Sequence, residues 1–285
     1  MKFENLLVEL GGFGRHQAMV ILLLVIPRLT IPFHFLLNNF IAAVPSHHCD
    51  ISALEAEGGL ENLTREQRLT VSIPPQEDGE MSSCQIFSEP QFHLLSNFSN
   101  ATNLPAVPCQ SGWVFDNSSF ISTLATEWDL VCDQRGMTKV TRPSSGRHFV
   151  FKRCWVMVGA AIFGTLSDRY GRKRMLLFSY LLSIFFAVAS AFSVNFAMFA
   201  ATRFFSGVAI SGISIISIVL CVEWVDIDHR TLAAVMISLD WTAAAVLLSG
   251  IAYLVNDWRY LTITVTSQLV LATLSWICRV ILYLP

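Results

Sequence analysis

The sequence predicts an all-α polytopic membrane protein with a large extracellular loop. Three observations support this fold class: 53% of the 285 residues are hydrophobic and only 14% are charged, long apolar runs recur along the chain, and most acidic residues lie between two of these runs. A soluble domain needs more charge to keep its surface wetted. A membrane-spanning helix needs about 20 mostly apolar residues to cross ~30 Å of hydrocarbon.

Five apolar runs meet that length, and each is a predicted span. They lie at residues 18–44, 175–193, 196–222, 231–255 and 260–284. We interpret the first as a retained anchor rather than a cleaved signal peptide. Its apolar core is longer than the roughly 7 to 15 residues of a signal sequence, and acidic as well as basic residues precede it.

The distribution of basic residues sets the orientation. Four Arg and Lys residues lie in the short connector at residues 167–174 and Arg230 lies in the one at 223–230, whereas the opposite connectors carry only Arg259. The positive-inside rule places the two basic connectors in the cytosol. Residues 1–17 and the C-terminus are then cytosolic as well, and residues 45–145 form an extracellular loop.

Two further signals agree that residues 45–145 face outside. The acceptor sequons of the chain all fall in this segment, at Asn62, Asn97, Asn100 and Asn117. Half-cystine candidates are also confined there, at Cys49, Cys84, Cys109 and Cys132. An even number of cysteines in an oxidising compartment predicts disulfides, with three connectivities open.

This topology requires one more crossing, which we place at residues 146–166. The clearly apolar part, residues 154–166, is short, roughly 20 Å of helix at 1.5 Å per residue. The basic stretch TRPSSGRHFVFKRCW, residues 141–155, runs into it. We expect residues 149–155 to form an interfacial turn from which long basic side chains snorkel outward.

One cytosolic connector carries a specific motif. The string GTLSDRYGRKR, residues 164–174, combines two glycines, one acid and a basic cluster between apolar runs. Gly164 permits close helix approach, Gly171 permits a tight reversal, and Asp168 can cap a helix or form an ion pair. The string resembles the signature loop between the second and third helices of the major facilitator superfamily.

Further motifs narrow the resemblance. They are GGFGR at residues 11–15, AAVPSHHC at 42–49, STLATEWDLVC at 122–132, EWVDIDHRT at 223–231 and DWR at 257–259. Together they resemble the organic ion transporter family of solute carriers, solute carrier family 22, in its anion-transporting branch. The resemblance covers residues 1–140 and 156–276. Residues 141–154 depart from it, because the family's second helix is apolar and rich in small residues there.

The resemblance implies both a fold and a function. The fold is the N-terminal six-helix half of a major facilitator transporter, and the function is alternating-access transport of small organic anions by a multi-pass plasma-membrane protein. The family continues into six more helices, so we expect this truncated chain to need a second copy or a full-length carrier beside it in the lipid bilayer. The alternative is a non-transporting membrane glycoprotein, either retained in the endoplasmic reticulum or associated with full-length carriers. Neither a cofactor nor nucleic acid is an expected partner.

Polar side chains at membrane depth are the first substrate candidates, because lipid makes them costly. Arg28 lies between Pro27 and Pro32 in the first span, where a bent helix would present a fixed cation to an anion. The alternative is that Arg28 snorkels toward the cytosol. His34 shares a helix face with Asn38 and is a candidate donor to a carboxylate, or else bonds to a neighbouring helix.

Other substrate candidates follow from the resemblance alone. The family's cavity positions correspond here to Phe35, Ser214, Ile218 and Trp241. Aromatic walls suit planar organic anions. Asp240 is harder to assign, because a carboxylate repels an anionic substrate. Three interpretations stay open: Asp240 is protonated, it pairs with Arg28 or Arg203, or the substrate charge is not purely negative.

The resemblance also implies a cytosolic charge network that latches the two halves of a carrier. Its members here are Gly164, Asp168, Arg169, Gly171, Arg172, Glu223 and Arg230. The alternative is solvated surface charge, worth ~0 to 1 kcal/mol per exposed pair. Neither catalysis nor metal binding is predicted, because the sequence has no nucleophile elbow, no phosphate-binding glycine loop and no Cys/His pair at metal spacing.

Overall fold

The computed structural model describes residues 28–56, 59–76, 80–95, 105–118, 120–132, 146–225 and 229–283. The chain divides into two compact units. Residues Met1–Ile41 and Lys139–Pro285 form a helical unit, and residues Ala42–Thr138 form a second unit. The predicted glycosylation sites Asn97 and Asn100 lie outside the described residues.

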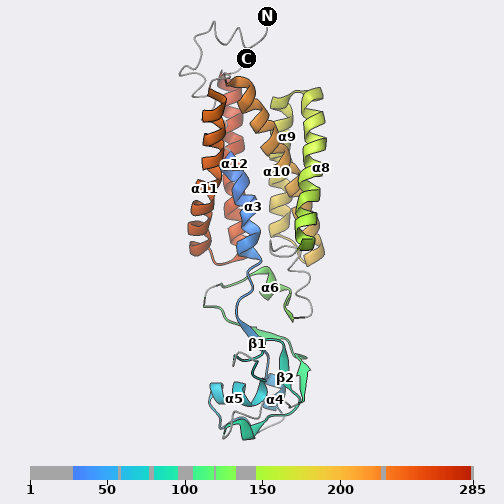
Figure 1. Ribbon diagram of the computed structural model, residues 1–285, viewed down its shortest axis with the longest axis vertical. Helices are drawn as coiled ribbons and strands as arrows, with labels where there is room; N and C mark the ends of the chain where they lie inside the picture. The colour runs from blue at the N-terminus through green and yellow to red at the C-terminus, as the bar shows by residue number, and fades with distance from the viewer. Residues whose placement is uncertain are drawn as a thin grey trace, which may run out of the picture. The chain divides into compact units, whose positions relative to one another are not determined.

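The helical unit is a bundle of long helices (Figure 1). Its elements are α3 (Thr30–Ile41), α8 (Gly146–Tyr170), α9 (Arg172–Ala191), α10 (Phe196–Trp224), α11 (Arg230–Leu254) and α12 (Trp258–Tyr283). Helix α10 contacts α3, α8, α9 and α11, and α12 contacts α3 and α9. Residues on α10 are therefore in position to meet side chains from most of the bundle.

Four helices of the described residues are long and apolar enough to cross a membrane. They are Arg172–Ala191, Phe196–Glu223, Arg230–Leu254 and Trp258–Ile277. These four overlap the predicted spans at residues 175–193, 196–222, 231–255 and 260–284. Helices α3 and α8 lie where the spans at residues 18–44 and 146–166 are expected, and their crossing of the membrane stays a prediction.

Helix α8 differs from expectation at its start. It begins at Gly146 and continues without a break through residues 149–155 to Tyr170, so the predicted interfacial turn is not formed. After Gly146, the stretch up to Trp155 contains neither proline nor glycine that would stop a helix. A helix also satisfies backbone groups that a turn would expose to lipid.

Glycines on α10 let α8 pack closely against it. A Cβ added at Gly207 would lie 2.5 Å from the ring of Trp155, and one added at Gly212 would lie 2.5 Å from the ring of Phe163. Both rings come from α8 and occupy the space that the missing side chains leave. Close approach through small residues gives van der Waals contact where no hydrophobic driving force exists between helices in lipid.

The reversal between α8 and α9 is made by one residue. Gly171 is the only residue between the two helices, and its φ of +89° lies in the region that side chains with a Cβ rarely adopt. The tight turn expected there is therefore formed. Gly164 is different: within the described residues, nothing lies within 4 Å of where its Cβ would be. The close helix approach expected at Gly164 is not made in this unit.

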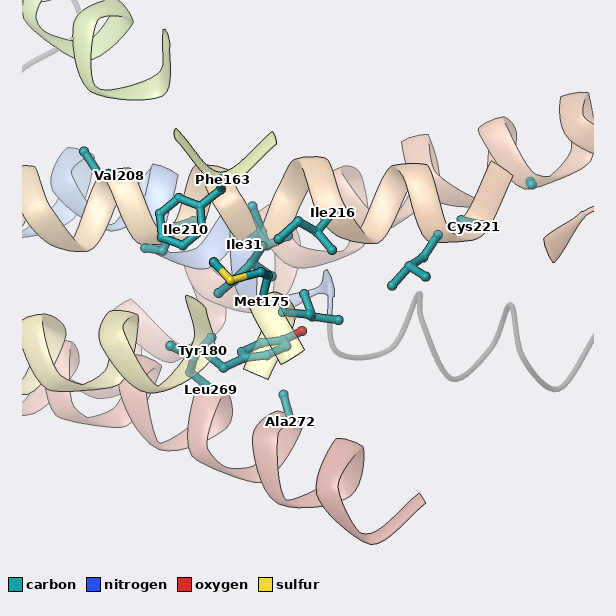
Figure 2. Packing of buried hydrophobic residues seen from close by; sticks show 14 of the residues in the cluster. Ile31, Phe163, Met175, Tyr180, Val208, Ile210, Ile216, Cys221, Leu269 and Ala272 are labelled. Atoms are coloured by element: carbon teal, nitrogen blue, oxygen red, sulfur yellow. The ribbon is translucent and has the colours of Figure 1, made fainter. Parts of the chain in front are cut away.

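Apolar side chains from several helices form the core of the helical unit (Figure 2). Figure 2 labels members of this cluster from different helices, among them Phe163 of α8, Tyr180 of α9, Ile210 of α10 and Leu269 of α12. Several buried hydroxyls are satisfied within their own helices, as where Ser179 donates to the carbonyl of residue 175 at 2.9 Å. Such bonds let polar residues lie in the core at little cost.

The second unit is small and mixed, with short helices and two antiparallel strand pairs. Its helices are α4 (Ser52–Ala56), α5 (Arg65–Ser72), η1 (Phe92–Leu95) and α6 (Leu124–Glu127). Its strands are β1 (His47–Cys49), which pairs with β4 (Trp113–Phe115), and β2 (Gln85–Phe87), which pairs with β3 (Ala106–Pro108). The all-α prediction therefore holds for the helical unit and is wrong for this one, where short extended segments pair instead.

Two disulfides join distant parts of the second unit. Cys49 bonds to Cys109, and Cys84 bonds to Cys132. This selects one of the three connectivities that the sequence leaves open. His47 lies with Cys84 and Cys132 in a group of side chains within 4.8 Å of one another, but the two sulfurs are bonded to each other and supply no thiolate for a metal.

Two predicted glycosylation sites lie on the surface of this unit. Asn62 and Asn117 are both exposed. Asn117 sits in a turn in which the backbone N–H and the hydroxyl of Ser118 donate to Asp116 at 2.9 and 3.0 Å. These bonds, with a third from Ser46, hold the pKa of the Asp116 carboxyl below its usual range. Glycosylation at these positions stays a prediction.

Candidate functional site

A buried ion pair links α11 to the residues that precede α3. Arg28 Nε donates to Asp240 Oδ2 at 3.1 Å, and these residues are only 6% and 4% exposed. Arg28 Nη1 also donates to Ser217 Oγ at 2.9 Å and to the carbonyl oxygen of Ser214 at 3.2 Å. We call Arg28, Asp240 and Ser217 the paired-arginine site.

The paired-arginine site decides between the interpretations of Asp240. The Asp240 carboxylate neutralises the Arg28 guanidinium beside it, so it does not add a net negative charge that would repel an anionic substrate. Arg28 in turn meets protein acceptors rather than an open cavity, and Ser214 contributes its carbonyl oxygen. Substrate binding by Arg28 and Ser214 stays a prediction, and any anion that binds there must compete with Asp240.

Three aromatic rings form a continuous group beside the paired-arginine site. The ring of Phe35 on α3 lies 5.3 Å from that of Trp155 on α8 and 5.8 Å from that of Trp241 on α11, measured between ring centroids. Trp241 follows Asp240 in the chain and is 45% exposed. This aromatic group, made of Phe35, Trp155 and Trp241, offers apolar surface next to a charged pair, as sites for amphipathic organic ions do.

The other predicted residues lie apart from this arrangement. Ile218 follows Ser217 on α10, but it is 37% exposed where Ser217 is 2% exposed, so the two side chains face different ways. His34 is buried, and it lines a pocket between α3, α8 and α10 whose polar members are His34, Asn38, Arg203 and Ser206. We call this the open pocket. The sequence places His34 and Arg28 in one group of substrate candidates. In the structure they belong to two different sites.

The cytosolic charge network is partly formed within the helical unit. Arg172, at the start of α9, lies 2.5 Å from Glu223 near the end of α10 and 3.5 Å from Asp168 near the end of α8. Three helix ends are therefore joined through one guanidinium. Asp168 and Glu223 are both exposed, so each pair is worth ~0 to 1 kcal/mol in the isolated unit. Arg169 lies over the ring of Tyr170, and Arg230 begins α11. A latch function for this network stays a prediction.

Sequence reasoning missed several residues that the fold brings to these sites. Trp155 is the last residue of the basic stretch at residues 141–155, and its aromatic side chain is the only signal for it. Ser217 lies three residues after Ser214 on the same face of α10. Arg203 was predicted only as a possible partner of Asp240. A polar residue beside a glycine in a spanning helix is a signal that would have pointed to Ser206.

Comparison with known proteins gives the relationship of the whole chain. The family model described as Major Facilitator Superfamily matches residues 155–284. Solute carrier family 22 member 7 from Bos taurus is 42% identical over 289 residues, which cover 97% of this chain and 51% of that protein. The Homo sapiens member 7 is 42% identical over 278 residues, covering 93% and 48%. Solute carrier family 22 member 6-B from Xenopus laevis is 37% identical over 265 residues, covering 92% and 46%.

The helical bundle, its buried ion pair and the family match define a multi-pass membrane protein of the major facilitator class. The identity to its relatives extends over nearly the whole chain. Within that class, the chain is homologous to members of solute carrier family 22 over most of its length. It spans about half the length of the curated relatives it matches.

These matches confirm the resemblance found in the sequence at the level of the family. The segments at residues 31–37 and 225–231 resemble organic anion transporter 2, which is member 7 of the family, and member 7 proteins are among the relatives at 42% identity. The relatives are solute carriers and not enzymes, which agrees with the prediction that the chain has no catalytic residues.

Proposed function

We propose that the chain forms the N-terminal six-helix half of a carrier for small organic anions, which acts by alternating access at the plasma membrane. In this proposal residues 45–145 form a glycosylated extracellular loop, and both termini are cytosolic. The substrate lies between this half and a second one, supplied by a second copy or a full-length carrier. The family relationship supports a transport role, and the positive-inside distribution of Arg and Lys supports the orientation.

The observation that carries the proposal is the combination of the paired-arginine site and the aromatic group on adjoining helices. A charged pair costs too much at membrane depth to be retained as inert packing, since well-packed apolar residues would be at least as stable. Trp241 is exposed within the helical unit, so its ring is available to a ligand or to a second half. Phe35 connects this ring to the interior of the bundle.

This arrangement suits an anion that carries an apolar body. The aromatic group gives the body a surface for stacking, and Arg28 provides the fixed donor for its acidic group once Asp240 is displaced. Asp240 then acts as an internal substitute for the anion and keeps the buried cation neutral when no substrate is bound. Binding then depends on how well the acidic group of the substrate competes with Asp240 for Arg28.

Uptake of a radiolabelled aromatic carboxylate tests the proposal. The chain is expressed alone, and also joined to the part of Bos taurus member 7 that lies beyond the match. We expect uptake equal to that of mock-transfected cells for the chain alone and clear uptake for the joined protein. Surface biotinylation establishes that both proteins reach the plasma membrane.

A matched pair of variants on α11 tests the role of the aromatic group. In the joined protein, Trp241→Ala should raise the apparent KM by about tenfold, the equivalent of ~1.4 kcal/mol of stacking. Tyr253→Ala removes an exposed aromatic ring near the end of the same helix and should leave KM within twofold. A joined protein that reaches the surface and shows no uptake would contradict the proposed function.

A further inference from the structure

The open pocket between α3, α8 and α10 contains more hydrogen-bonding groups than the protein satisfies. Its walls include the rings of Phe35 and Trp155. Both ring nitrogens of His34, Ser206 Oγ and Arg203 Nε are buried, and none has a hydrogen-bond partner among the described residues. His34 is 5% exposed and Ser206 is 1% exposed, so lipid or bulk water does not reach them freely.

Unpartnered groups of this kind are rare, and each costs about 1 to 3 kcal/mol when it is left unsatisfied. In this pocket they come from two separate helices, α3 and α10, and they line one space. Asn38 Oδ1 is also buried without a partner there, and turning its amide would bring the NH₂ donor to the same place. The pocket therefore directs several hydrogen-bonding groups from α3 and α10 at one space.

The charge of the pocket indicates what that occupant is. Arg203 keeps its positive charge under all ordinary conditions. Within the described residues, its guanidinium donates to Thr262 Oγ1 at 3.3 Å and lies 5.4 Å from the ring of Phe199, and it forms no ion pair with a carboxylate. A threonine hydroxyl and an aromatic face do not neutralise a cation.

Arg28 provides an internal comparison for Arg203. Both arginines belong to the same bundle, and the fold gives Arg28 a carboxylate, a hydroxyl and a carbonyl as acceptors. Arg203 receives one hydroxyl, and the donors around it have no acceptor of their own. Water would satisfy some of these donors but would leave the charge uncompensated, whereas an anion answers both needs.

We propose that the open pocket binds a small monovalent anion, held by Arg203, His34 and Ser206. The chemistry fits either a free inorganic ion or the carboxylate group of an organic anion. In the second case the body of the ligand would lie against the rings of Phe35 and Trp155 at the pocket wall. This site is separate from the paired-arginine site, and its occupancy does not depend on whether the chain transports.

The experiment measures thermal unfolding of the full chain in detergent at constant ionic strength, followed by tryptophan fluorescence. Sodium gluconate, whose polyhydroxyl chain does not suit the apolar rings of Phe35 and Trp155, is replaced stepwise by chloride, nitrate, acetate or benzoate. We expect a saturable rise in the unfolding temperature, because a ligand that binds only the native state stabilises it according to its concentration and affinity. A rise with chloride and nitrate identifies an inorganic ion, and a rise confined to acetate and benzoate identifies a carboxylate.

Three variants separate an anion site from simple packing. Arg203→Gln and His34→Leu should each raise the half-saturating anion concentration by at least about tenfold. Ser206→Ala is the mildest change: without anion its unfolding temperature should equal or exceed that of the parent, and its half-saturating concentration should still rise several-fold. Arg68→Gln in the second unit, where Arg68 pairs with Glu55, is the matched control and should leave the anion dependence unchanged.

The result that would overturn the proposal is equally specific. If every anion, including gluconate, has the same effect on the parent and on all three variants, the effect is a general salt effect and the pocket binds none of them. The absence of any anion dependence in the folded parent would overturn it as well. A folded Ser206→Ala protein keeps the test decisive even where Arg203→Gln fails to fold.

Discussion

Replacing Asp240 by asparagine tests the physical basis of the paired-arginine site. Asparagine keeps an acceptor oxygen at nearly the same place but removes the negative charge that lies 3.1 Å from Arg28 Nε. The guanidinium cannot lose its proton, so a buried cation would remain with only neutral acceptors. Breaking a buried pair from one side typically costs 3–5 kcal/mol, and the retained acceptor places the expected loss near the lower end, at about 3 kcal/mol.

The same reasoning predicts the outcome of a double-mutant cycle. Arg28→Met and Asp240→Leu are the two single variants; each leaves one charge unpaired and should cost at least about 3 kcal/mol, while the two together replace the whole pair by apolar groups. Such replacements are often neutral or stabilising, so the double variant should lie within about 1 kcal/mol of the parent. The two substitutions are therefore expected to be coupled by at least about 3 kcal/mol.

The measurement is the free energy of unfolding in mixed micelles titrated with sodium dodecyl sulfate, followed by tryptophan fluorescence. Ser238→Ala is the control, because Ser238 is an exposed residue of the same helix whose hydroxyl donates to the carbonyl of residue 234. It should change the free energy by less than about 0.5 kcal/mol. If the double variant loses the sum of the two single losses, Arg28 and Asp240 do not act as a pair and the reasoning fails.

Two further predictions concern the helix seam and the disulfides. Gly207→Val should destabilise the helical unit by about 1 to 3 kcal/mol in detergent unfolding, because the new side chain meets the ring of Trp155. Gly250→Val is the matched control, since nothing lies within 4 Å of where its Cβ would be. Equal losses in both variants would contradict close packing of α8 on α10 at Gly207. Replacing Cys49 and Cys109 by serine opens a cross-link over a sequence separation of 60, worth about 4 kcal/mol of chain entropy, so the second unit should become sensitive to limited proteolysis. Unchanged protease resistance would show that this unit does not depend on the bond.

The spans were predictable from sequence because hydrophobic length is a property of one segment at a time. Helices α9 to α12 occupy the apolar runs for this reason, and Gly171 makes the turn that its freedom at positive φ predicts. The second unit was less predictable, because pairs such as Gln85 with Pro108 depend on loop folding rather than on periodicity. The start of α8 was predicted wrongly. Its charges indicated an interfacial turn at residues 149–155, but these residues contain no helix breaker and continue the helix.

The hydrophobic pattern of the sequence does not predict which helices contact each other. The sequence identifies Arg28, His34 and Trp241 as unusual residues in apolar runs, but it does not say which helices adjoin. Arg28 and Asp240 are 212 residues apart, and their meeting requires α11 to lie beside α3. Trp155 joined the aromatic group for the same reason, through a glycine on α10 that lets its helix approach.

The pairing of Asp240 has a consequence for the rest of the bundle. Two arginines, Arg28 and Arg203, were candidate partners for this one carboxylate, and a single carboxylate neutralises only one cation. Because the fold gives Asp240 to Arg28, the positive charge of Arg203 remains uncompensated among the described residues of the helical unit. Pairing with Asp240 neutralises the charge of Arg28. Arg203 keeps its charge and is therefore the stronger binding group for an anion that enters the bundle.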